Sequence, residues 1–175
     1  MSQLKSPVSA QDHVQGDADA AVTLVEYGDY QCPFCGEAYP IVKRLQEKFG
    51  KTLRFVFRNF PLAQMHEFAM GAAEVAEAAA LQGKFWQMHD RLYENQDALD
   101  PDSLMGHARH LHLDMARLQA AIRSDAVEGK IKADFRSGVR SGVNGTPCFF
   151  INGARFDGNW TEEGEFAAAI EQAGT

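Results

Sequence analysis

Residues 21–35 read AVTLVEYGDYQCPFC, and this stretch decides the fold. Its first seven residues are largely apolar and β-branched, which predicts a short buried strand that ends at Gly28 and Asp29. Two of the three cysteines of the chain, Cys32 and Cys35, follow directly with two residues between them. Such a pair indicates a redox centre, half of a metal site, or two inert thiols, and the surrounding sequence has to distinguish these possibilities.

A helix and a second strand are predicted immediately after the cysteine pair. Residues 37–49 carry apolar side chains at helical spacing, and Gly50 follows as a C-terminal stop. Residues 53–58, LRFVFR, predict the second strand. The order strand, helix, strand suggests a parallel pair with a right-handed crossover. The cysteines then lie at the first strand-to-helix turn.

The middle of the chain predicts helices only, and the pattern returns to strands near the end. Residues 65–137 contain an alanine-rich helix, an aromatic helix, and helix starts at Asp100 and Asp114. Residues 146–151 then predict a strand, Asn152-Gly153 a two-residue hairpin and residues 154–157 its return strand. A last helix is expected from about residue 161 to 172. We therefore predict an α/β fold with a helical insertion of about 70 residues.

Composition limits the classes of partner. The 175 residues include 17 basic and 24 acidic side chains, for a formal net charge of −7, so nucleic acid and anionic membranes are not expected as partners. No stretch approaches the roughly 18 apolar residues of a spanning helix, so membrane insertion is not expected. Residues 1–20 are polar, with no apolar run after Lys5, which predicts a flexible lead-in, no export signal and a cytoplasmic protein. A periplasmic location would follow if an export signal had been removed. Cytosolic thiols are mostly reduced, which favours a catalytic or metal-binding pair over a structural disulfide.

The position of the pair predicts different roles for the two cysteines. The thiolate is the reactive form of cysteine, and the free N–H groups at a helix N-terminus can lower its pKa from about 8.5 to about 3.5–7.5. Cys32 lies at the predicted helix start, and Pro33 fits the first helical turn. Cys35, one turn later, should be more buried and less acidic. We expect Cys32 to attack and Cys35 to resolve.

Two readings from other functional classes stay open. Zinc could be held by Cys32, Cys35, Cys148 and a histidine, although we expect no metal. A non-catalytic module with chaperone-like binding would hold clients without using its thiols. A redox titration that responds to Cys32→Ser separates both from an enzyme.

The segments VEYGDYQCPFC (25–35) and GVNGTPCFFING (142–153) resemble the DsbA-like thiol:disulfide oxidoreductases of the thioredoxin superfamily. The resemblance covers about residues 12–173. It implies a thioredoxin-like domain formed by residues 21–62 and 138–175, interrupted by a helical insertion at 63–137. It also implies dithiol–disulfide exchange on protein or peptide thiols, with a redox-active disulfide, no further cofactor, and a redox recycling partner.

The resemblance also assigns supporting residues. Thr146 and Pro147 resemble the family's Thr–cis-Pro turn, which faces the cysteines and pairs with an extended substrate strand. Glu26 resembles the buried acid that moves protons to and from the resolving cysteine. From the residues alone, Glu26 could instead reach solvent, Arg54 or Arg58.

Two features depart from DsbA itself. DsbA has Pro-His between its cysteines, whereas this chain has Pro33 and Phe34, and Phe34 cannot donate a hydrogen bond to the thiolate. We therefore expect the pair to be less oxidising than that of DsbA. The family works largely outside the cytoplasm, which leaves a cytosolic reductase, an isomerase or a peroxide-linked thiol enzyme open.

Three further expectations concern the surroundings of the pair. Tyr30, Phe34 and Phe60, with Thr146, are predicted to contact substrate, the aromatic side chains as an apolar rim around the sulfurs. Cys148 follows Pro147 directly, so we expect it to face the core. A regulatory disulfide with the active pair is its alternative role.

Overall fold

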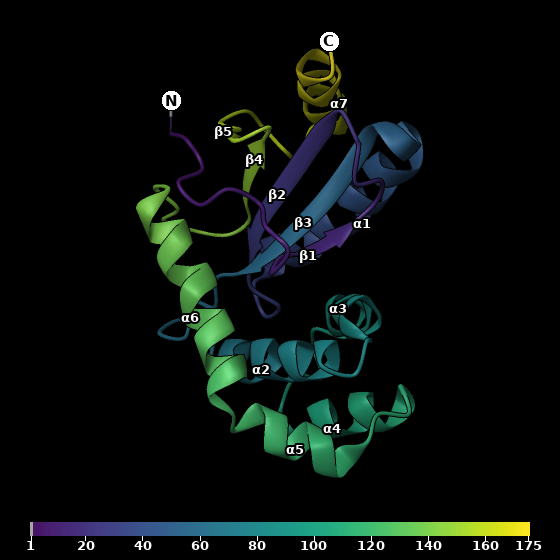
Figure 1. Cartoon of the computed structure of the whole chain (residues 1–175), viewed down its shortest axis with the longest axis vertical. Coiled ribbons are helices and arrows are strands. Elements are labelled where there is room, and N and C mark those ends of the chain that lie inside the picture. The colour runs from purple at the N-terminus through teal and green to yellow at the C-terminus, as the bar shows by residue number, and fades with distance from the viewer. Residues whose placement is uncertain (1) are drawn as a thin grey trace.

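A five-stranded sheet forms the centre of the upper part of the molecule (Figure 1). The structure is a computed structural model and describes residues 2–175. The strands follow one another across the sheet in the order β1-β3-β2-β4-β5. Only β2 and β3 pair in parallel, as predicted, and each of the other neighbouring pairs is antiparallel. The strands are β1 (His13–Gln15), β2 (Val22–Gly28), β3 (Leu53–Asn59), β4 (Cys148–Ile151) and β5 (Ala154–Arg155).

Helices lie on both faces of the sheet and form a separate layer below it (Figure 1). They are α1 (Pro33–Phe49), α2 (Ala69–Ala80), α3 (Phe85–Glu94), α4 (Pro101–His110), α5 (Met115–Ile122), α6 (Asp125–Arg140) and α7 (Glu163–Ala173), with a 3₁₀ turn η1 (Gly50–Thr52) after α1. Helices α2 to α5 make up the lower layer, and the long α6 runs back along one side to the sheet. The predicted α/β fold with a helical insertion is confirmed.

Local sequence signals explain where several elements begin and end. Asp100 accepts a hydrogen bond from the Ser103 N–H and so caps α4, while Asp114 caps α5 in the same way. Gly50 has a φ of 50° directly after α1, a backbone conformation that favours glycine. Asn152 and Gly153, with φ values of 47° and 84°, form the tight hairpin between β4 and β5.

The two faces of the sheet bury different sets of side chains. Leu24 on β2 and Phe149 on β4 belong to the larger core, which continues through α1 and α7 into the helical layer. Val25 and Phe150, one residue further along each strand, belong to a smaller core beneath α6 and the N-terminal segment. Side chains alternate between faces along a strand, so neighbours in sequence enter different cores. The larger core joins the insertion to the sheet as one packed unit.

The structure corrects two predicted boundaries. Residues 13–15, expected to be part of a flexible lead-in, form β1 and pair antiparallel with β3 at the edge of the sheet. Asp12 forms a buried ion pair with Arg58 on β3, 2.8 Å between Oδ1 and Nε. The polar composition of residues 1–20 hid this strand, because three residues are too few to show a periodic pattern. At the other end of the insertion, α6 runs past residue 137 to Arg140 without a break.

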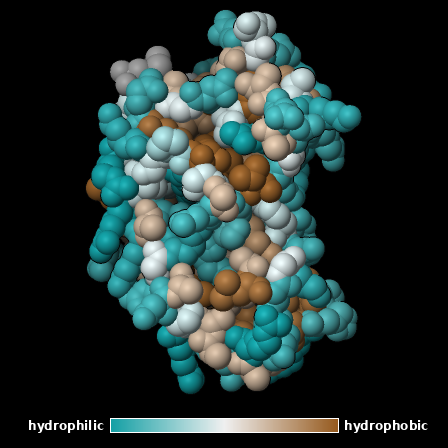
Figure 2. All heavy atoms as spheres, viewed as in Figure 1, coloured by the Kyte–Doolittle hydropathy of each residue, from teal (hydrophilic) through white to brown (hydrophobic). Residues whose placement is uncertain are grey.

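The face seen in Figure 2 carries two small apolar areas with hydrophilic atoms between them. One lies over the sheet and the other over the helical layer. This face therefore has no single continuous apolar patch of the kind that marks a large protein interface.

Candidate active site

Cys32 is the residue immediately before α1. It has extended backbone angles, with φ −64° and ψ 121°, and Pro33 begins the helix as its first residue. Its Sγ lies 3.5 Å from the carbonyl oxygen of Thr146, to which the thiol donates a hydrogen bond. Residues 114 positions apart in the sequence therefore meet at one sulfur atom.

The surroundings of Cys32 favour its thiolate. Its pKa falls from an ordinary 9.0 to about 5, chiefly because the Cys35 thiol hydrogen-bonds to the Cys32 sulfur. Burial acts in the opposite direction, while the Thr146 side chain and the backbone N–H groups of Cys35 and Phe34 add to the lowering. Those two N–H groups are free because they belong to the first turn of α1.

Cys35 has the contrasting environment of a resolving thiol. It is fully buried, and this burial, its hydrogen bond to Cys32 and the nearby charge of Glu26 raise its pKa well above 9.0. In this structure all three cysteines are free thiols. The pair therefore combines one thiol that ionises easily with a close neighbour that holds its proton.

Glu26 points from β2 into the same core. It is 2% exposed, and burial together with the Cys32 thiolate raises the pKa of its carboxyl to about 8. The alternative partners are engaged elsewhere, because Arg54 donates to Thr23 and Arg58 to Asp12. Glu26 is thus a buried carboxyl whose pKa lies near neutral pH.

The segment before β4 provides the opposite wall of the site. The peptide bond between Thr146 and Pro147 is cis, and the Thr146 carbonyl faces Cys32. Phe34 projects outward beside the pair with 58% of its surface exposed.

The prediction that Tyr30 and Phe60 form an apolar rim around the sulfurs is wrong. Tyr30 is 1% exposed and Phe60 is 3% exposed, so neither can form part of an apolar rim. Tyr30 packs against aromatic rings of the core and its hydroxyl bonds to His89, while Phe60 stacks on Phe135 of α6 with ring centroids 4.3 Å apart. Nearness to Cys32 in the sequence placed them at the site, but their side chains point away from the surface.

Sequence reasoning missed the residues that hold the active-site turn in place. Asp29 is buried: one of its oxygens accepts from the N–H groups of Gln31 and Cys32, and the other from Leu62 N–H and His66. Its position directly after a predicted buried strand was the available signal.

Gln96 holds the same turn from the insertion side. It comes from the loop between α3 and α4, and its Nε2 donates to the carbonyl oxygens of Tyr30 at 2.8 Å and Cys32 at 2.9 Å. Gly36, on the first turn of α1, leaves room for the Gln96 side chain, which a Cβ at that position would overlap. No motif in the sequence marks Gln96.

Cys148 lies on the other face of the sheet. It pairs with Tyr27 in the β2–β4 register, and both belong to the smaller core, whereas Cys32 and Cys35 belong to the larger one. The expectation that Cys148 faces the core is confirmed. Nowhere in residues 2–175 do three or more His, Cys, Asp or Glu side chains gather as a metal site would require. The geometry thus gives no support to a zinc site that includes Cys148.

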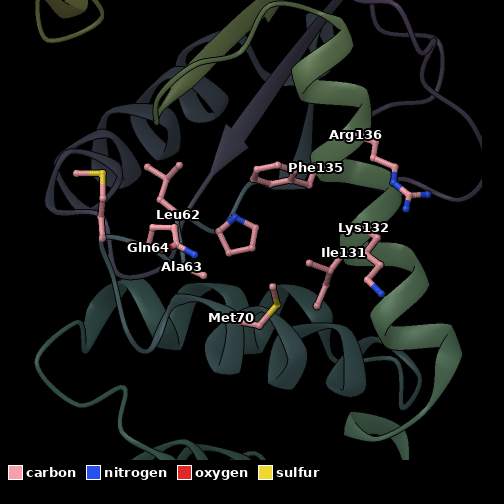
Figure 3. Close-up of a pocket in the computed structure, with 10 residues that line it drawn as sticks. Leu62, Ala63, Gln64, Met70, Ile131, Lys132, Phe135 and Arg136 are labelled. Atoms are coloured by element: carbon pink, nitrogen blue, oxygen red, sulfur yellow. The ribbon is translucent and has the colours of Figure 1, made fainter.

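A groove of about 420 Å³ opens between the segment after β3 and helix α6. Leu62, Met70, Ile131 and Phe135 converge on it, and Lys132 and Arg136 stand on its α6 rim (Figure 3). One wall is attached to the active-site turn, because the Leu62 N–H donates to Asp29 over 2.9 Å. The groove is lined mainly by apolar side chains.

Comparison with known proteins identifies the family and the fold of this chain. A family model described as Thioredoxin matches residues 9–172. A thioredoxin-like oxidoreductase from Silicibacter pomeroyi DSS-3 superposes with a TM-score of 0.84 at 29% identity, covering 94% of this chain and 93% of that one. BdbD from Bacillus subtilis in its oxidised form superposes with a TM-score of 0.86 at 23% identity, covering 99% and 98%, which shows the shared fold.

Curated relatives with higher identity are longer proteins. A Salinispora tropica protein named Na(+)/H(+) antiporter NhaA 3 is 43% identical over 159 residues, which are 91% of this chain but 24% of that protein. The chain thus spans about a quarter of the length of the relatives it matches. Among residues 2–175, no helix combines the length and apolar character needed to cross a bilayer. By family model, fold and structural neighbours, the chain belongs to the thioredoxin family and has the fold of its DsbA-like thiol-disulfide oxidoreductases.

Proposed function

We propose that this protein catalyses dithiol–disulfide exchange on protein or peptide thiols through Cys32 and Cys35. The observation that carries the proposal is the difference between the two sulfurs: the Cys32 pKa is lowered to about 5, and that of Cys35 is raised. A thiolate is both the better attacking group at neutral pH and the better leaving group. The chemistry needs no cofactor, since the electrons reside on the sulfur atoms.

Each direction of exchange uses the pair differently. To oxidise a client, the Cys32–Cys35 disulfide is attacked at Cys32 by a client thiolate, and Cys35 leaves as a thiol. A second client thiol then attacks the mixed disulfide, forming the client disulfide and releasing Cys32 as a thiolate. To reduce a client, the Cys32 thiolate attacks the client disulfide, and Cys35 resolves the mixed disulfide. A redox recycling partner restores the starting state of the pair.

The thiolate of Cys32 favours the oxidising direction. Stabilising this anion stabilises the reduced protein and makes its disulfide a stronger oxidant. A pKa of about 5 lies between those of the nucleophilic cysteines of thioredoxin, about 7, and DsbA, about 3.5. We therefore expect the pair to be more oxidising than that of thioredoxin and less oxidising than that of DsbA. Oxidation suits a compartment in which disulfides persist, such as the periplasm, whereas a cytoplasmic protein would act as a reductase or isomerase.

Client binding would use the surface around Cys32. The backbone of Thr146 can pair with an extended client strand, and exposed Phe34 adds apolar contact beside the sulfur. The groove lined by Leu62, Ile131 and Phe135 extends this surface toward α6. Of the antiporter-named relatives, only the quarter of their length that matches this chain is relevant to its function.

A redox titration against glutathione tests the proposal. Wild-type protein should show a two-electron transition, which Cys32→Ser should abolish and Cys148→Ser should leave in place. A wild-type protein that shows no transition between about −350 and −80 mV would overturn it. Client binding that survives unchanged in Cys32→Ser, without exchange activity in the wild type, would favour the chaperone-like alternative.

A further inference from the structure

Two buried oxygen atoms near the cysteine pair have no hydrogen-bond partner: Glu26 Oε1 and the Tyr93 hydroxyl. An unsatisfied buried polar group costs free energy comparable to a lost hydrogen bond, so few survive in a folded protein. Among residues 2–175, only a handful of buried side-chain atoms share this condition. Two of them in one place require an explanation.

Gly28 shows that the two oxygens face a common point. A Cβ on Gly28 would lie 2.9 Å from the Tyr93 hydroxyl oxygen and 3.1 Å from Glu26 Oε1. The φ of Gly28 is not in the left-handed region, so its backbone does not require glycine. What glycine provides here is space, because the Cβ of any other residue would crowd both oxygens and overlap Phe57.

Tyr93 is held in this position by its packing. It comes from α3 of the insertion, and its ring lies 4.9 Å from that of Tyr30 and 5.5 Å from that of Tyr39, centroid to centroid. Burial raises the pKa of its hydroxyl well above 10, and charges on Cys35 and Glu26 add to the effect. The hydroxyl therefore keeps its proton and remains a donor close to both groups.

We propose that Tyr93 is a positioning residue whose hydroxyl donates, through a bridging water, to the ionised Glu26 carboxylate, which accepts the proton of Cys35. This inference rests on the proposed exchange activity. In the resolving step, the Cys35 proton moves to the Glu26 carboxylate and the resulting thiolate attacks Cys32 Sγ. The Cys32–Cys35 bond forms as the bond from Cys32 to the client sulfur breaks, and the client leaves as a thiolate. Because neither oxygen has a direct partner in the structure, Tyr93 donates through one water molecule and keeps its own proton.

The test is the pH dependence of the resolving step. Reduced protein is mixed with oxidised glutathione, and the unimolecular phase in which Cys35 resolves the Cys32–glutathione disulfide is followed at each pH. Removing a donor from an ionised carboxylate disfavours the ionised form, so Tyr93→Phe should raise the midpoint assigned to Glu26 by about one to two pH units. In a Glu26→Gln background, Tyr93→Phe should shift nothing.

Tyr39→Phe is the matched control. Tyr39 stacks on the ring of Tyr93, but its hydroxyl donates to Glu94 over 3.0 Å at the surface. It should leave the midpoint unchanged. If Tyr93→Phe behaves like Tyr39→Phe while the wild type exchanges normally, Tyr93 has no such role. If the wild type does not exchange at any pH, the proposed function itself fails.

A second measurement avoids any dependence on the folding of Tyr93→Phe. In wild-type protein labelled with ¹³C at the tyrosine Cζ, the Tyr93 resonance should titrate together with Glu26. The same resonance should stay constant over this pH range in Glu26→Gln. A Tyr93 resonance that does not shift as Glu26 ionises in the wild type would overturn the inference.

Discussion

Cys32 and Cys148 both lie close to Thr146 yet have opposite chemistry. Cys32 contacts the carbonyl of Thr146, and Cys148 is only two residues beyond Thr146 in the chain. Cys32 lies at the start of α1 with a pKa of about 5, whereas burial raises the pKa of Cys148 above 9.0. The difference teaches that closeness to the active turn does not make a thiol reactive. The helix end and the Cys35 hydrogen bond do so, and β4 directs Cys148 to the other face of the sheet.

The strongest test of this contrast replaces each sulfur in turn. Cys32→Ser should lower the rate of dithiol–disulfide exchange by about 10³-fold or more, because it removes the attacking atom. Cys148→Ser should change the rate by less than about twofold. The rate of insulin reduction measures the effect. A large loss in Cys148→Ser, with folding intact, would mean that the two faces of the sheet are chemically coupled.

The pH dependence of alkylation sharpens the contrast. The thiolate fraction rises with pH through the pKa, so the reaction of Cys32 with iodoacetamide should reach half its plateau at about pH 5. Cys148 should still be gaining reactivity above pH 9, since burial raises its pKa above 9.0. At pH 5.5 we expect Cys32 to react more than about tenfold faster. Peptide mass mapping of partly alkylated protein gives both rates, and a Cys32 midpoint near 9 would contradict the proposed site.

Glu26 makes the stability of the protein on the cysteine face of the sheet depend on pH near neutrality. Its pKa is raised from 4.5 to about 8, so the folded protein keeps a proton that the unfolded chain has lost. This contribution is complete below pH 4.5 and disappears as pH rises through 8. Taken alone, Glu26 therefore lowers stability in this window by up to about 1.4 kcal/mol for each pH unit. In the reduced protein Cys32, whose pKa is lowered from 9.0 to about 5, contributes a rise in stability with pH that opposes it.

Glu26→Gln should remove the Glu26 contribution to this slope, so the stability that the reduced variant gains over the wild type should be larger at pH 9 than at pH 6. Urea unfolding of the reduced protein at pH 6 and pH 9 measures the difference. Glu37→Gln, at an exposed position on α1, is the control and should keep the wild-type slope. A Glu26→Gln protein with an unchanged slope would show that this carboxyl is ionised at neutral pH.

The smallest effect is expected from the residue between the cysteines. Phe34→His would place a donor beside the thiolate where Phe34 offers none. The pKa of Cys32 should fall further, and the reduction potential should become less negative by up to about 30 mV per pKa unit. Phe34→Leu should leave both quantities near their wild-type values. The glutathione titration measures both potentials. Equal potentials for Phe34→His and Phe34→Leu would show that the residue at position 34 does not influence the reduction potential.

Much of the fold could be predicted because its signals are local. The β-branched run of β2, the caps at Asp100 and Asp114, and the Asn152-Gly153 turn each depend on residues near in sequence. The short β1 strand lacked such a signal, and only its pairing with β3 reveals it.

The candidate site divides in the same way. By itself, the sequence determined that Cys32 and Cys35 lie between a buried strand and a helix, because an apolar β-branched run precedes them and apolar residues at helical spacing follow them. Only the tertiary structure decided that Tyr30 and Phe60 turn inward and that Gln96 holds the active-site turn. It alone also places the Tyr93 hydroxyl and the Glu26 carboxyl beside Gly28. The reason is physical: helix ends and strand periods are set by neighbouring residues. Side-chain partners that are tens of residues apart are set by packing, which no local pattern encodes.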